Sequence, residues 1–158
     1  MMATIPQTTP DTYLTGTTAL SIPTEEGDVA DWHFDAAFLR EGTRFRVAGA
    51  NFPSTSNLLG RFGIRECANV LRARAVPLPT HQPVYAATYA RAVLDLLLTT
   101  TAEHKQPAFL QASDILEEDD LQSVLDQLDT VRDRIEDSKQ LSLIDQWIHE
   151  QLLETVVA

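Results

Sequence analysis

The chain has 158 residues, 44% of them hydrophobic and 22% charged, which suits one ordinary domain with a packed core. No apolar run approaches the roughly 18–20 residues needed to cross a bilayer, and residues 1–14 have neither the basic residue nor the apolar core of a secretory signal. The single cysteine, Cys67, excludes an intramolecular disulfide and fits a reducing compartment. We therefore expect a soluble, cytoplasmic protein.

The net charge of −11 is unevenly distributed along the chain. Residues 1–35 hold six acidic residues and no basic one, residues 36–94 hold eight arginines against two glutamates, and residues 95–158 hold fifteen acidic residues against four basic ones. We expect the central arginines to be paired in part by the chain's own acids. The C-terminal third should remain an anionic surface, which repels nucleic acid and attracts basic partners.

The first predicted elements are short. Residues 12–23, "TYLTGTTALSIP", are β-branched and apolar and predict a strand or hairpin arm. Residues 32–40, "WHFDAAFLR", predict a short helix with Asp28 or Asp31 as its N-cap. Residues 44–52, "RFRVAGANF", alternate polar and apolar positions as a half-buried strand does.

The middle of the chain contains one ambiguous segment and one clear helix. Residues 65–75, "RECANVLRARA", fit either a short helix or a strand, and three prolines between 77 and 83 predict an extended connector. Residues 84–100, "VYAATYARAVLDLLLTT", place their apolar side chains on one helical face. In this helix Arg91 and Asp95 are spaced to form an i,i+4 ion pair.

The C-terminal part predicts a helical hairpin. One helix, capped by Ser113 or Asp114, carries a heptad-like apolar stripe over residues 121–135, and a second, capped by Ser138, covers residues 139–157. Their apolar faces suit antiparallel pairing. We therefore expect an α+β fold: a small β-containing N-terminal unit (1–98), a linker (99–112) and an acidic helical hairpin (113–158).

Residues 27–38, "GDVADWHFDAAF", concentrate chemically active side chains. Asp31, His33 and Asp35 could form an acid–base pair or hold a metal. On a helix, however, Asp31 and Asp35 share a face from which His33 points away, and no second histidine lies nearby. We favour a capped helix start, with a small enzyme using His33 and Asp31 as the alternative.

No other motif in the sequence identifies an enzymatic reaction. A lone Cys67 among arginines could be a nucleophile, but a small core residue is the simpler interpretation. Phosphate-binding glycine loops and the signatures GxSxG, HExxH and CxxC are absent from the sequence. We predict no catalytic residue, metal or cofactor.

Two sets of residues are candidates for binding. Arginines near aromatic residues and glycines could bind an anion or nucleic acid if internal ion pairs do not occupy them: Arg44, Arg46, Arg61 and Arg65. The apolar stripe of the acidic helices predicts a partner-binding surface, because such a stripe packs against either the rest of the chain or another protein. Its candidate contact residues are Leu121, Leu128, Ile135, Leu141, Trp147 and Ile148.

The runs "TYLTGTTALSIPTEEGDVADWHF", "GRFGI" and "PVYAATYARAVLDLL", within residues 13–98, resemble a group of small, uncharacterised bacterial proteins with a "YLTG…AL.IP…GDWH" start. The group is associated with toxin–antitoxin or defence gene pairs, as the non-enzymatic member. Here Gly27 and Asp31 are further apart than in that pattern, and Phe62 stands where a tyrosine is expected. The resemblance implies an antitoxin-like protein and carries over no active-site residue.

From charge, helices and resemblance together, we expect an antitoxin-like protein that binds a toxin enzyme with a basic surface. An acidic mimic of DNA, inhibiting a nucleic-acid-binding protein, is a further alternative.

Overall fold

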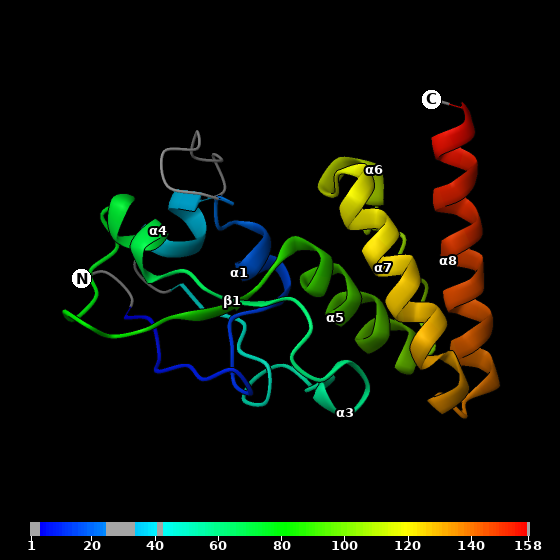
Figure 1. Ribbon diagram of the computed structural model, residues 1–158, viewed down its shortest axis with the longest axis horizontal. Coiled ribbons are helices and arrows are strands. Elements are labelled where there is room, and N and C mark those ends of the chain that lie inside the picture. The colour runs from blue at the N-terminus through cyan, green and yellow to red at the C-terminus, as the bar shows by residue number, and fades with distance from the viewer. Residues whose placement is uncertain (1–3, 25–33, 41–42, 158) are drawn as a thin grey trace.

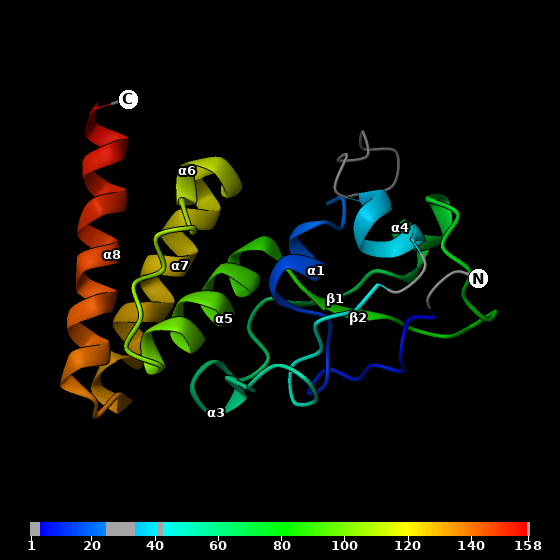
Figure 2. The ribbon, with the colours of Figure 1, turned by 180° about the vertical axis from the view of Figure 1, so that it is seen from behind.

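The computed structural model describes residues 4–24, 34–40 and 43–157. The chain folds into a mixed α+β structure with one small antiparallel sheet and a helical C-terminal part (Figure 1). In both views the N-terminal unit lies at one end, the last helix lies at the other, and helix α5 stands between them (Figures 1 and 2). The predicted fold class is confirmed.

The N-terminal unit is built from short elements around the two-stranded sheet, with β1 paired to β2 in the register Ile64↔Ala87. The Glu66 carboxylate holds the sheet to the next helix, because its Oε2 accepts hydrogen bonds from the backbone N–H groups of Ala68 (2.8 Å) and Val84 (2.7 Å). The elements of the unit are α1 (Gly16–Leu20), the π-helical turn η1 (Asp35–Leu39), α3 (Ser56–Leu59), β1 (Ile64–Glu66), α4 (Ala68–Ala73) and β2 (Tyr85–Ala87).

Two predicted strands are wrong. In residues 12–23 the chain forms α1, and Leu14 makes only isolated bridges to Val47 and Ala86. In residues 44–52 one edge hydrogen-bonds to the backbone of residues 13–15. On the other edge the amide of Asn51 takes the place of a strand: its Oδ1 accepts from the N–H of Val47 (2.7 Å), and its Nδ2 donates to the carbonyl of Phe45 (2.8 Å). Tertiary contacts thus override the local β propensity of both segments.

Of the helix predicted over residues 32–40, the structure describes Phe34 as α-helical and residues 35–39 as η1, whereas residues 32–33 and the proposed caps Asp28 and Asp31 lie outside the described residues. An aromatic cluster surrounds this turn. The rings of Phe34 and Phe38 stack with centroids 5.0 Å apart, and Phe45 lies 5.6 Å from Phe38. Together with α4, these rings form the core of the N-terminal unit.

The ambiguous segment 65–75 contains both elements that its sequence allowed, because β1 ends at Glu66 and α4 begins at Ala68. The long helix starts later than residue 84, since residues 85–87 form β2. Helix α5 (Tyr89–Ala102) begins after Thr88, whose Oγ1 accepts a hydrogen bond from the N–H of Arg91 (3.3 Å). This cap fixes the register of α5.

The C-terminal part consists of α6 (Ala112–Ile115), α7 (Glu118–Val131), the 3₁₀ turn η2 (Arg132–Arg134) and α8 (Ser138–Val157). Helices α7 and α8 lie side by side and antiparallel in both views, as predicted (Figures 1 and 2). Both predicted caps are wrong. Extended backbone at Leu116 separates α6 from α7, so Glu117 is the N-cap of α7, and Asp137 caps α8 by accepting from the N–H of Lys139 (3.0 Å).

The largest hydrophobic cluster contains residues from both sides of position 98, where the sequence predicted the N-terminal unit to end. The apolar face of α5, including Leu94 and Leu97 at 0% exposure, packs against the apolar faces of α7 and α8. Residues 103–111 run alongside α8. The His104 ring hydrogen-bonds with the Asp137 carboxylate, and the indole N–H of Trp147 donates to the carbonyl of Leu110 (2.8 Å). Residues 99–102 belong to α5. The C-terminal helices therefore cover α5 and share its core.

Candidate functional site

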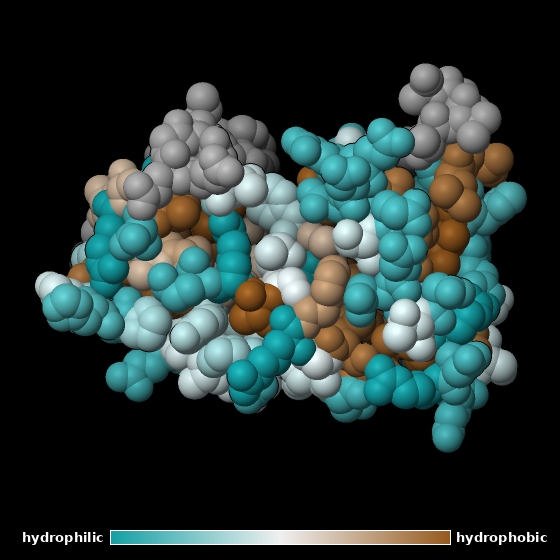
Figure 3. Space-filling view, viewed as in Figure 1, coloured by the Kyte–Doolittle hydropathy of each residue, from teal (hydrophilic) through white to brown (hydrophobic). Residues whose placement is uncertain are grey.

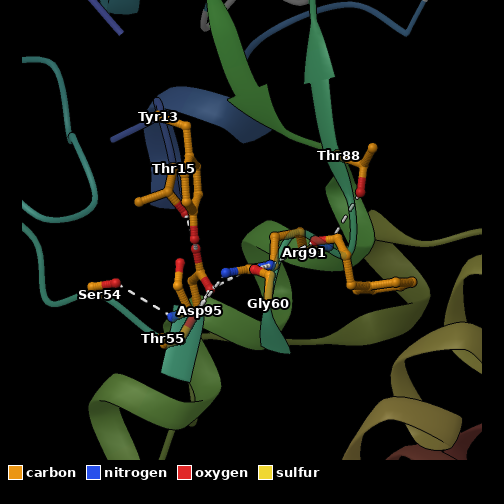
Figure 4. Close-up of polar contacts among 10 residues, drawn as sticks. Tyr13, Thr15, Ser54, Thr55, Gly60, Thr88, Arg91 and Asp95 are labelled. Atoms are coloured by element: carbon orange, nitrogen blue, oxygen red, sulfur yellow. Dashed lines mark hydrogen bonds and ion pairs between the residues drawn. The ribbon is translucent and has the colours of Figure 1, made fainter. Parts of the chain in front are cut away.

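A fully buried ion pair lies on α5. The guanidinium Nε of Arg91 donates to the Oδ1 of Asp95 at 2.9 Å, and both side chains are 0% exposed (Figure 4). The i,i+4 pairing predicted from the sequence is confirmed. Taking two charges out of water is costly unless further hydrogen bonds satisfy both of them.

Hydroxyl groups from distant segments satisfy the carboxylate (Figure 4). Tyr13 and Thr15 donate to the Oδ2 of Asp95 at 2.8 and 2.6 Å, and Thr55 donates to Oδ1 at 2.6 Å. Burial and the neighbouring Asp95 carboxylate raise the pKa of Tyr13, which keeps its phenol protonated as a donor.

Backbone carbonyls satisfy the guanidinium. The Nη1 of Arg91 donates to the carbonyls of Gly60 (2.9 Å) and Phe62 (2.6 Å), and the group lies 5.1 Å from the centre of the Tyr13 ring. Gly63 packs so closely that an added Cβ would lie 2.6 Å from the Cβ of Arg91. The pair therefore joins three chain segments, and its complete burial fits a structural cross-link rather than a reacting centre.

The structure places the predicted partner-binding stripe inside the main core. Leu128, Ile135 and Trp147 are 2–8% exposed, so in this fold they contact the protein itself and are not surface residues. The other three predicted contacts, Leu121, Leu141 and Ile148, are partly buried and pack against the same cluster. The stripe is therefore explained by packing against α5, whose apolar face it buries.

The polar side of these helices is strongly acidic. We call the exposed carboxylates of α7 and η2 the acidic face; its members are Glu118, Asp119, Asp126, Asp129 and Asp133. Among the described side chains of residues 113–153, only two carboxylates form ion pairs, and neither belongs to the acidic face. Asp145 pairs with Arg132 (2.9 Å), and Asp137 pairs with His104. No carboxylate of the acidic face therefore forms an ion pair with a described side chain, although Arg132 lies close enough to Asp129 and Asp133 for their charges to raise its pKa.

Two exposed leucines form an apolar patch at the end of α8 that lies away from η2 (Figure 1), and this patch was not predicted. Leu152 and Leu153 are 45% and 52% exposed near the C-terminal end of α8, which lies at the same end of the molecule as the start of α7 (Figure 1). The space-filling view shows apolar surface along this part of α8 and hydrophilic side chains over α6 and α7 (Figure 3). These two leucines are candidate apolar contacts for another molecule.

The candidate anion-binding arginines do not act as one group. Arg61 pairs with Asp11 (3.2 Å), and Arg65 donates to the carbonyls of Thr24 (2.7 Å) and Pro23 (2.9 Å). The exposed Arg44 and Arg46 form no ion pair with any described side chain. The expected internal pairing of the arginines is therefore realised in part.

The structure describes only some of the remaining reactive residues. Burial raises the pKa of the Cys67 thiol to about 12, so the thiolate nucleophile is suppressed. Of the predicted acid–base cluster, Asp31 and His33 lie outside the described residues, and Asp35 is described only as the first residue of η1. Across residues 4–24, 34–40 and 43–157, no three His, Cys, Asp or Glu side chains gather as metal ligands.

No helix within the described part of the chain combines the length and the apolar character that spanning a membrane requires. In comparisons with known proteins, no family model, no curated protein and no solved structure matches this chain.

Proposed function

We propose that this protein is an antitoxin-like inhibitor that binds a toxin enzyme through the acidic face of α7 and η2, with the Leu152–Leu153 patch near the start of α7 as a second contact. The observation that carries the proposal is that the carboxylates of the acidic face form no ion pair with a described side chain. Surface charge of one sign steers a partner of the opposite sign and raises its association rate. The partner is accordingly an enzyme with a basic surface.

Because the predicted stripe is buried, the proposed contacts with the partner are exposed residues instead. Leu128, Ile135 and Trp147 maintain the core, whereas the acidic face supplies steering and the exposed leucines supply apolar contact.

Deleting the C-terminal helices is a poor test, because it would bare the apolar face of α5 and unfold the rest. Surface charge substitutions leave this packing intact. Asp126→Asn, Asp129→Asn and Asp133→Asn together remove three charges from exposed positions of the acidic face. A matched control, Asn69→Lys, Ala73→Lys and Thr80→Lys, changes the net charge equally at exposed positions of the N-terminal unit.

The partner is first captured from the native host with the full chain, identified by mass spectrometry and expressed with and without the chain. We expect the chain to restore growth. The three aspartate substitutions should lower the association rate about tenfold at low salt, and high salt should abolish this difference. Growth inhibition that the chain does not relieve would refute the antitoxin role. Equal effects of the two triple variants would refute the acidic face as the binding surface.

A further inference from the structure

A cleft lies between the N-terminal unit and the turn that joins α6 to α7. Its volume is about 270 Å³, which is smaller than the roughly 300–1,000 Å³ of sites for drug-sized ligands. It suits a small metabolite and is too small for a nucleotide. Its lining residues are Thr24, Arg65, Thr88, Tyr89, Ile115, Glu117 and Asp120.

Opposite charges line this cleft without touching. Arg65 enters from β1, and Glu117 and Asp120 enter from the start of α7. No nitrogen of Arg65 lies within 4.0 Å of an oxygen of either carboxylate. Elsewhere on α7–α8, Arg132 and Asp145 make a bidentate pair with both distances at 2.9 Å, so an arginine and a carboxylate pair directly here when the backbone brings them together.

Two backbone carbonyls hold the guanidinium of Arg65 in place. Nη1 donates to the carbonyl of Thr24 and Nη2 to that of Pro23. Each terminal nitrogen carries a second N–H, and the buried Nε has no hydrogen-bond partner among the described residues. The group is therefore fixed in orientation and retains donors that an anion could use.

Among the other described lining residues, Tyr89 and Ile115 provide apolar surface. The hydroxyl of Tyr89 donates to the carbonyl of Ile22 at 2.6 Å, which fixes this side chain in the wall, and Ile115 adds an aliphatic surface. The cleft thus presents one oriented cation, two carboxylates and an apolar wall.

We propose that this cleft binds a free α-amino acid, whose carboxylate contacts Arg65 and whose ammonium group lies between Glu117 and Asp120. A zwitterion satisfies both sets of charges at once, and the apolar wall receives its side chain. The site is independent of the proposed antitoxin role. Because its walls belong to the N-terminal unit and to α7, an occupied cleft links the two parts of the molecule and stabilises the whole chain.

The test is calorimetric titration of the full chain with each of the common α-amino acids. We expect at least one to bind, and its N-acetyl and amide derivatives, which lack one charge each, to bind at least about tenfold more weakly. Failure of every amino acid to bind, or equal affinity for the derivatives, would overturn the proposal.

Variants locate the site. Glu117→Gln and Asp120→Asn each remove one carboxylate charge from the cleft and should weaken binding about tenfold or more. Asp119→Asn is the matched control, since Asp119 is exposed on the same helix turn and does not line the cleft. An amino acid that binds the Asp120→Asn and Glu117→Gln variants as tightly as the Asp119→Asn variant is bound elsewhere, and the assignment of this cleft is then wrong.

Discussion

Replacing Asp95 with asparagine should destabilise the protein far more than any surface charge substitution. The side chain is 0% exposed and accepts hydrogen bonds from Arg91, Tyr13, Thr15 and Thr55. Asparagine keeps the shape but removes the charge, which leaves the guanidinium of Arg91 buried without its counter-ion. Breaking a buried pair in this way costs about 3–5 kcal/mol, a large part of the ~5–15 kcal/mol that stabilises an ordinary domain.

The surface pair between Arg132 and Asp145 provides the control. Its carboxylate side chain is 50% exposed, so Asp145→Asn should cost at most about 1 kcal/mol, the range measured for exposed ion pairs. Urea unfolding of both variants, followed by far-ultraviolet circular dichroism and by the fluorescence of the buried Trp147, gives the two free energies. With a slope of about 2 kcal/mol per molar urea, the Asp95 variant should unfold at a midpoint lower by roughly 2 M.

A loss at Asp95 no larger than that at Asp145 would refute the conclusion that the buried pair joins the N-terminal segments to α5. Hydrogen exchange adds a local check. The amides around Tyr13 and Thr55, which lie in segments held by Asp95, should lose protection first in the Asp95→Asn variant.

Three further predictions concern stability and reactivity. Gly63→Ala should cost about 2–4 kcal/mol by thermal or urea unfolding, because its φ of +69° and the 2.6 Å approach of the buried arginine both oppose a Cβ; Gly60→Ala, with open space around it, should cost only about 1–2 kcal/mol. Cys67 should resist iodoacetamide at pH 8 until the protein unfolds, since burial raises its pKa to about 12; modification of the folded chain at the rate of a free thiol would contradict this. The hydrogen bond from His104 lowers the pKa of Asp137, so this carboxylate contributes stability above its unfolded pKa of about 3.9 that is lost as pH falls through the lower folded value. The stability difference between wild type and Asp137→Asn should therefore shrink in acid, and a difference that stays constant from pH 7 to pH 2 would contradict it.

The long helices were predictable because their signal is local. Apolar residues three and four positions apart define the buried faces of α5, α7 and α8, and the i,i+4 spacing alone identifies the pairing of Arg91 with Asp95. Periodicity does not say what covers an apolar face, however. The same stripe that holds Leu128 and Trp147 in the core was equally consistent with a surface for another protein.

The buried network and the short elements depend on contacts that are distant in the sequence. Tyr13 and Thr15 are separated from Asp95 by 82 and 80 positions, and no pattern around them marks either as a buried donor. Residues 12–23 look like a strand by composition, yet only residues 13–15 hydrogen-bond to neighbouring backbone, at residues 46–48 and 85–87, and the chain then turns into α1, which contacts α5. Local propensity gives the wrong element where such tertiary contacts decide.

The shared core of α5, α7 and α8 also sets the order in which the chain can fold during synthesis. Helix α5 leaves the ribosome first, while the segments that cover Leu94 and Leu97 follow only after residues 118–153 have been made. At a synthesis rate of about 5–20 residues per second, the apolar face of α5 stays bare for several seconds. In that interval any other amphipathic helix pair, including one from a second nascent copy, can occupy the place of α7 and α8. Because α7 and α8 are synthesised after α5, the uncovered apolar face of α5 is a site at which misassembly can begin.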